Sequence, residues 1–167
     1  GPEFSFVLIG KSCFAKQLNQ LQELRVRYML ALDDGPVRSP AKVLQSLGIK
    51  EKVIKLEDAP QENVLRALEE AHTFITLAKV DGCRVLVHSP SGTNRAGAVV
   101  VSYMMSHISL RRKPPWGSEV LQKPLALLAQ NWWPVLTQAS FRIQLLLWAQ
   151  EGFMADRAQN GPMWGVM

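Results

Sequence analysis

Short apolar runs rich in leucine and β-branched residues alternate along the chain with longer segments of helical periodicity, and this alternation restricts the possible folds most strongly. Such a pattern predicts an α/β domain in which a sheet lies between helices. We expect strands at 6–9, 27–32, 53–56 and 84–88. We expect helices at 14–24, 62–80, 95–107, 119–130 and 138–153. The third helix is strongly apolar, so we expect it to be central and buried against the sheet.

The length of 167 residues suits a single domain with one core. Hydrophobic residues make up 47% and charged residues 20%, which is the composition of a globular protein. We expect residues 5–154 to form this domain and residues 155–167 to be a loose C-terminal tail. Residues 1–4, Gly-Pro-Glu-Phe, are interpreted as a cloning remnant. No apolar run reaches the ~18 residues of a membrane span, so none is predicted.

The net charge bears on the kind of partner, and the cysteines bear on the cellular compartment. The net charge of +5 favours an anionic partner, although the one basic run, Arg111-Arg112-Lys113, is more typical of a solvated loop than of a nucleic-acid patch. Cys13 and Cys83 have neither disulfide nor metal-ligand spacing, which indicates a reducing compartment, the cytoplasm or the nucleus. His72 and His107 have no partner at metal-ligand spacing, and no metal or other cofactor is predicted.

The segment 88–97, His-Ser-Pro-Ser-Gly-Thr-Asn-Arg-Ala-Gly, carries the most functional information. It joins a strand end to an apolar helix through a short polar loop, and the first amides of such a helix have no intrahelical partners. These amides and the helix dipole favour an anion, Gly92 allows the loop to curl, and Arg95 can grip two phosphate oxygens. The segment therefore predicts a phosphate site. The alternative is an ordinary strand-to-helix turn with a surface arginine.

This segment resembles the His-Cys-x5-Arg signature of the protein tyrosine and dual-specificity phosphatases, with Ser89 in place of the cysteine. The resemblance covers most of the chain: Leu56-Glu57-Asp58 with Asn63 is similar to the family's general-acid loop, 74–82 to the helix that leads into the signature strand, and 141–148 to the closing helix. The small size is similar to the dual-specificity branch. The resemblance implies a single-domain dual-specificity-phosphatase-like fold with a short, mostly parallel central sheet flanked by helices.

The resemblance also implies a role for each matching residue. Ser89 takes the position of the nucleophile that forms a cysteinyl-phosphate intermediate, Arg95 binds the phosphoryl oxygens, and Asp58 protonates the leaving oxygen and then activates water. The backbone amides of Ser91, Gly92, Thr93, Asn94 and Arg95 would bind the same oxygens, and His88 would support the loop structurally. From the sequence alone, Asp58 could equally be a turn-forming acid before Pro60, but its interval to position 89 matches the family.

Three departures from the family pattern bear on activity. A serine hydroxyl is a poor nucleophile without an adjacent base, whereas a cysteine beside cationic groups ionises readily. The only nearby base is His88, whose implied role is structural, so we expect the Ser89 form to bind phosphate without hydrolysing it. Ala96 stands where the family usually has a hydroxyl, which weakens activity without excluding it. The segment 113–138 before the closing helix is long for the family.

Two histories fit Ser89. In the first, the natural protein is an active dual-specificity phosphatase whose cysteine was replaced, and the retained Asp58 favours this history. In the second, serine is native and the protein is a pseudophosphatase that binds phosphorylated partners, which Ala96 mildly favours. A third hypothesis, an RNA 5′-phosphatase, rests on Asn94 before Arg95, and the scattered basic residues disfavour it. The expected partners are phosphorylated proteins, with phosphotyrosine first and phosphoserine or phosphothreonine next, and phosphate or sulfate ions, in preference to nucleic acid.

Overall fold

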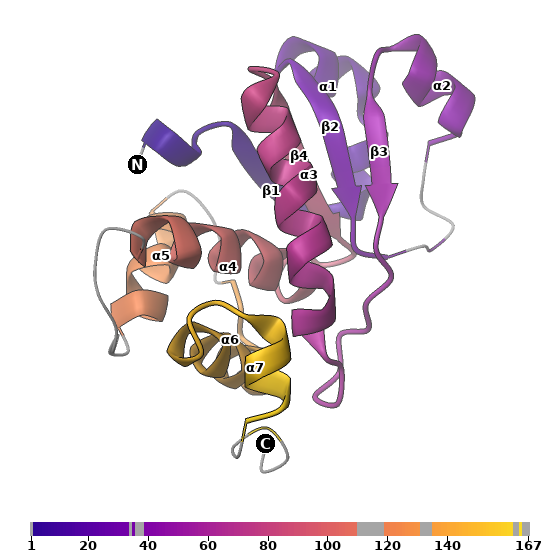
Figure 1. The fold of residues 1–167 in the computed structure, drawn as a ribbon. Coiled ribbons are helices and arrows are strands. Elements are labelled where there is room, and N and C mark those ends of the chain that lie inside the picture. Colours follow the sequence, from indigo (N-terminus) through magenta and orange to yellow (C-terminus); the bar gives the residue numbers. More distant parts are fainter. Residues whose placement is uncertain are drawn as a thin grey trace.

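The computed structural model describes residues 2–33, 35, 39–109, 119–130, 135–161 and 164. Parallel strands form one four-stranded sheet in the order β1-β4-β2-β3, with helices on both faces (Figure 1). The strands are β1 (Val7–Lys11), β2 (Val26–Ala31), β3 (Lys50–Val53) and β4 (Arg84–Ser89). The α-helices are α1 (Leu18–Glu23), α2 (Ala41–Ser46), α3 (Leu68–Val80), α4 (Arg95–Ser109), α5 (Glu119–Ala129), α6 (Ala139–Gln150) and α7 (Ala155–Gln159). Short 3-10 helices are η1 (Pro2–Phe4), η2 (Ser12–Lys16) and η3 (Val64–Ala67). The predicted α/β fold with a parallel sheet is confirmed.

Different helices cover the two faces of the sheet, because neighbouring side chains along a strand point to opposite sides. Val85 and Val87 of β4 pack into the larger core with residues of α3, α4, α5 and α6. Leu86, which lies between them, packs into a smaller core with Leu21 of α1 and Leu44 of α2. The central strand β4 is therefore buried on both faces, as its continuous apolar sequence predicts.

Helix α4 lies in the middle of the larger core and contacts β1, β4, α3, α5 and α6. Its buried side chains include Ala96, Val99, Val100, Tyr103 and Met104. Because α4 starts directly after the loop that leaves β4, the core fixes its N-terminus at the carboxyl edge of the sheet. This is the edge at which parallel α/β sheets bind ligands.

Several elements differ from the sequence prediction. The third strand is Lys50–Val53 and not 53–56, because an edge strand with one neighbour tolerates the charged residues that hid it in the sequence. The expected helix at 14–24 is divided into η2 and α1, and the one at 62–80 into η3 and α3. Helix α2 was not predicted.

Both ends of the described chain contribute to the fold. Phe4, which belongs to the expected cloning remnant, is buried and packs edge-to-face on Tyr103 with 6.2 Å between ring centroids. Residues 155–159, within the segment expected to be loose, form helix α7, and its Ala158 is buried. The run Arg111-Arg112-Lys113 lies outside the described residues. Within the described ranges, no helix is long and apolar enough to cross a membrane.

Candidate phosphate-binding site

The loop after β4 curls tightly beneath the N-terminus of α4. Gly92 has a φ of +71°, and a Cβ at this position would lie 2.8 Å from the backbone carbonyl carbon and oxygen of Gly10 in β1. Only glycine avoids both the left-handed strain and this contact. The amide of Gly92 donates to the carbonyl of Ser89 at 3.0 Å and closes the turn. The predicted need for glycine thus has two physical causes.

Ser89 ends β4 and its side chain is buried under the loop. Its hydroxyl oxygen accepts a hydrogen bond from the Ala96 amide at 3.3 Å, so the side chain points at the first turn of α4. His88 points to the other face of the sheet, where its Nδ1 lies 3.1 Å from the Ser12 hydroxyl. Among the described residues, no basic group is hydrogen-bonded to the Ser89 hydroxyl.

The loop amides divide into two groups. Those of Gly92 and Thr93 donate within the loop, the latter to the Ser91 hydroxyl at 3.2 Å. Those of Ser91, Asn94 and Arg95 donate to no described residue. They lie at the positive end of the α4 dipole, so they are available to an anion. Of the five amides predicted to bind phosphate, these three are not used by the described residues, and their binding of phosphate stays a prediction.

The guanidinium of Arg95 links the loop 89–95 to two other segments, one that contains Leu56 and one that contains Asp33. Its Nη1 donates to the Leu56 carbonyl at 3.0 Å and lies 3.9 Å from Oδ1 of Asp33. The Arg95 side chain is only 14% exposed, which limits its motion. Both contacts use Nη1, which leaves the Nε–Nη2 edge for a second, two-point contact.

Asp58 lies beside the loop and is exposed. Its Oδ2 accepts a hydrogen bond from Nδ2 of Asn94 at 3.2 Å. The Oδ1 of Asn94 in turn accepts from the Gln138 amide at 2.9 Å and from the Thr137 hydroxyl at 3.2 Å, just before α6. The structure thus brings Asp58 into contact with Asn94, 36 residues further along the chain, while Arg95 contacts Leu56 in the same segment as Asp58.

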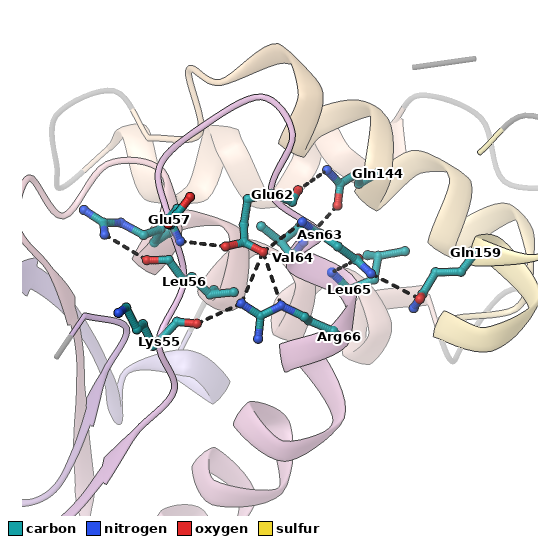
Figure 2. Close-up of polar contacts among 11 residues, drawn as sticks. Lys55, Leu56, Glu57, Glu62, Asn63, Val64, Leu65, Arg66, Gln144 and Gln159 are labelled. Carbon is teal, nitrogen blue, oxygen red and sulfur yellow. Dashed lines mark hydrogen bonds and ion pairs between the residues drawn. The ribbon is translucent and has the colours of Figure 1, made fainter. Parts of the chain in front are cut away.

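Glu62 holds the base of the segment that carries Asp58, as Figure 2 shows. Its carboxylate accepts from the amides of Glu57 at 2.8 Å and Asn63 at 2.9 Å, and pairs with Arg66 at 3.2 Å. Burial would raise the pKa of Glu62, but these hydrogen bonds and the Arg66 charge hold that pKa below its ordinary value. Glu62 is therefore ionised at neutral pH and keeps these contacts.

Sequence reasoning missed Asp33, Glu62 and the side-chain role of Asn94. Asp33 could have been found, because it directly follows β2, the neighbour of β4, and parallel strands end at one edge. Glu62 and Asn94 carry no such signal, since their partners are set by the tertiary fold. Within the described part of the chain, no group of three or more metal-ligating side chains occurs.

Known proteins resemble this chain in sequence. The family model "Dual specificity phosphatase, catalytic domain" matches residues 8–116. The Drosophila melanogaster "Dual specificity protein phosphatase MPK-4" is 29% identical over 150 residues, which is 90% of this chain and 36% of that protein. Mouse "Dual specificity protein phosphatase 19" is 30% identical over 104 residues, 60% of this chain and 44% of that protein. The chain spans less than half the length of these relatives.

Solved structures share the fold. The Yvh1 phosphatase domain from Chaetomium thermophilum has a TM-score of 0.72 at 20% identity and covers 90% of this chain and 94% of its own. The human tyrosine phosphatase-like serine/threonine/tyrosine-interacting protein has a TM-score of 0.71 at 22% identity, with 91% and 96% covered. The family model covers well over half of the sequence, including β4, the loop and α4. The chain belongs to the dual-specificity phosphatase family.

Proposed function

We propose that this chain binds phosphorylated protein at the loop 89–95, and that in its Ser89 form it holds the phosphate monoester without hydrolysing it. The observation that carries the proposal is the environment of Ser89. Its hydroxyl lies at the end of β4, at the position expected for the family's nucleophilic cysteine, and faces the amide-rich first turn of α4. An oxyanion bound above Ser89 would meet the three available loop amides.

Binding is supported by the electrostatics of the loop. The N-terminus of α4 and the amides of Ser91, Asn94 and Arg95, which donate to no described residue, place partial positive charges at the loop. The Nε–Nη2 edge of Arg95 adds a planar, permanently charged donor pair that matches two phosphate oxygens. A dianionic phosphoryl group satisfies all these donors, whereas a neutral side chain satisfies few of them.

The lack of turnover follows from the nucleophile. A serine hydroxyl must lose its proton to attack phosphorus, and an adjacent base usually removes it. His88 cannot do so from its position, because its ring is turned toward Ser12 on the other face of the sheet. The proposal therefore assigns phosphate recognition, without covalent chemistry, to the Ser89 form.

A cysteine form of the same domain would be a phosphatase, and the place of Asp58 beside the loop favours this second function. A cysteine thiolate would attack phosphorus while the bond to the leaving oxygen breaks and that oxygen takes the proton of Asp58. The Asp58 carboxylate would then remove a proton from water, which attacks the cysteinyl-phosphate, releases inorganic phosphate and restores the thiolate.

Isothermal titration calorimetry with a phosphotyrosine peptide and its unphosphorylated counterpart tests the binding proposal. We expect only the phosphorylated peptide to bind, and Arg95→Ala to weaken its affinity by about ten-fold or more, because a bidentate charge-assisted contact is lost. Arg84→Ala is the matched control, since Arg84 lies at the opposite end of β4. Equal binding of both peptides, or an unchanged affinity in Arg95→Ala, would contradict the proposal.

The same titration separates phosphoprotein from RNA as the ligand. One bound phosphoryl group gives a shallow dependence of affinity on salt, whereas several RNA phosphates give a steep one. We expect a shallow slope with the phosphopeptide and no tighter binding of a 5′-phosphorylated RNA. Tighter RNA binding with a steep slope would favour the RNA 5′-phosphatase hypothesis.

A further inference from the structure

Asn94 occupies the residue before α4, where an asparagine side chain usually caps its own helix. Here the backbone carbonyl of Asn94 accepts from Ala98 at 2.7 Å and starts the helix, but the side chain turns outward. Its amide group contacts Asp58 on one side and the residues before α6 on the other. The Asn94 side chain thus leaves the Arg95 amide, the first of α4, to a ligand, whereas the Ala96 amide donates to Ser89.

The orientation of the Asn94 side chain is determined by its neighbours. A backbone N–H can only donate, so the atom that faces the Gln138 amide at 2.9 Å must be the amide oxygen. The Thr137 hydroxyl donates to the same oxygen. The NH₂ group must therefore face Asp58, and it donates to Oδ2 and leaves Oδ1 for the proton that a general acid transfers.

The segment that carries Asp58 is fastened at several places, among them the Leu56 carbonyl, which accepts from Arg95 at 3.0 Å, and the Pro60 carbonyl, which accepts from Ser140 at 2.6 Å. Glu62 binds the Glu57 amide at its base, and the Arg66 guanidinium donates to the Lys55 carbonyl at 2.9 Å beside it (Figure 2). The bond from Asn94 holds the part that projects toward the phosphate loop. Without Asn94, the exposed carboxylate would have no described side chain to direct it.

We propose that Asn94 is a positioning residue, which holds Asp58 over the phosphate loop and ties that position to the start of α6. This inference rests on the proposed function, in that it assigns Asp58 the proton transfer to the leaving oxygen. Asn94 itself does not touch the reacting atoms through its side chain. Its contribution is to the acid step and not to the binding of phosphate.

The substitution Asn94→Asp tests this role in the Ser89→Cys background. Aspartate keeps an oxygen for Gln138 and Thr137 but presents a second oxygen to Asp58 where the NH₂ group was, so the contact with Asp58 is reversed. The substitution also adds a negative charge beside the loop, which acts on both substrates and cancels in the ratio of their rates. Initial rates are measured for phenyl phosphate, whose leaving group needs a proton, and for 2,4-dinitrophenyl phosphate, whose leaving group does not. We expect the ratio of the first rate to the second to fall by about ten-fold or more.

Two comparisons separate positioning from a general defect of the loop. Thr137→Val removes a contact to the same Asn94 oxygen without touching Asp58, and it should leave the ratio unchanged. In the Asp58→Asn background, Asn94→Asp should change the ratio of the two rates by less than two-fold, because the two residues act on one step. Equal losses on both substrates, or additive effects of the two substitutions, would overturn the proposal.

Amide hydrogen exchange tests the same contact in the Ser89 chain, without any need for activity. If Asn94 holds the segment, Asn94→Asp should accelerate exchange of the Glu57 amide by about five-fold, the effect of one lost hydrogen bond, while amides of the central strand β4 are unaffected. An unchanged Glu57 rate would overturn the proposal. If the Ser89→Cys protein is inert, the hydrolase assignment fails, and the exchange measurement still decides whether Asn94 holds this segment.

Discussion

At the scale of single residues, the site depends on backbone geometry as much as on charge. Ser89 and Arg95 carry the chemistry that we propose, but Gly92 decides whether the loop can face an anion at all. Its left-handed φ and its close approach to Gly10 exclude any side chain. The loop therefore tolerates a change of nucleophile more readily than a change of this glycine.

Gly92→Ala should abolish measurable binding of phosphopeptide and lower the melting temperature, because the new Cβ would meet the Gly10 backbone at 2.8 Å and force the loop to open. Gly48→Ala is the matched control: Gly48 also has a positive φ, +72°, but a Cβ there would have nothing within 4 Å. It should lose about 1 kcal/mol of stability from strain and keep the affinity. Intact phosphopeptide binding in Gly92→Ala would show that the loop is not held against β1.

At the scale of elements, a buried glutamine joins helix α6 to the segment that carries Asp58. Gln144 is 2% exposed, donates to the Glu62 carbonyl at 2.7 Å and accepts from the Val64 amide at 2.9 Å (Figure 2). The Val64 amide is in a buried hydrogen bond, and the Glu62 carbonyl is in a partly buried one. The glutamine therefore satisfies two backbone groups that an apolar side chain would leave unpaired in the interior or at its edge.

Gln144→Leu should lower the free energy of unfolding by about 2–4 kcal/mol, since each unsatisfied buried group costs about 1–3 kcal/mol. Urea denaturation measures the loss. Gln150→Leu, an exposed position on the same helix, should change the stability by less than about 0.5 kcal/mol. Similar values for the two variants would mean that α6 is not fastened to this segment through Gln144.

At the scale of the whole molecule, the packing of α3, α4 and α6 partly buries a neutral histidine. His72 of α3 lies 2.8 Å from the Ser102 hydroxyl of α4, and its ring packs edge-to-face on Tyr103 and Trp148. Burial, followed by the nearby His107, lowers the pKa of His72 from 6.5 to about 3. The folded chain therefore keeps this ring uncharged at a pH where the unfolded chain protonates it.

This histidine should make the fold sensitive to acid. Between pH 6.5 and about 3 the unfolded state binds one more proton at His72, so stability rises with pH across this window. The stability that depends on neutral His72 is fully present above pH 6.5. It is lost on acidification, and the free energy of unfolding falls by up to about 1.4 kcal/mol per pH unit. Urea denaturation of the wild type and of His72→Gln from pH 7 to pH 4 measures it. An equal pH dependence in the two proteins would contradict the assignment.

The sequence predicted the parts of the molecule whose signals are local. The apolar period of α4 and the segment 88–97 predict a buried helix that starts directly after a polar loop, and the helix and the strand before the loop lie where expected. Anion binding by this loop stays a prediction. The predicted position of the edge strand β3 was wrong by three residues, because the charged residues of this strand break the apolar pattern. The contacts of Asn94 and Glu62 could not be predicted, since they depend on which distant segments the sheet and helices bring beside the loop.

We propose that a thiolate at position 89 is enough to make this site a phosphatase, even with Ala96 in place of the usual hydroxyl, and hydrolysis of an aryl phosphate by the Ser89→Cys protein tests this most directly. We expect steady-state turnover from Ser89→Cys and none from the Ser89 form, because Arg95 and the N-terminus of α4 favour the ionised thiol. Adding Asp58→Asn should slow phenyl phosphate hydrolysis by about 10²–10⁴-fold. A folded Ser89→Cys protein that binds phosphopeptide but hydrolyses no aryl phosphate would contradict the account.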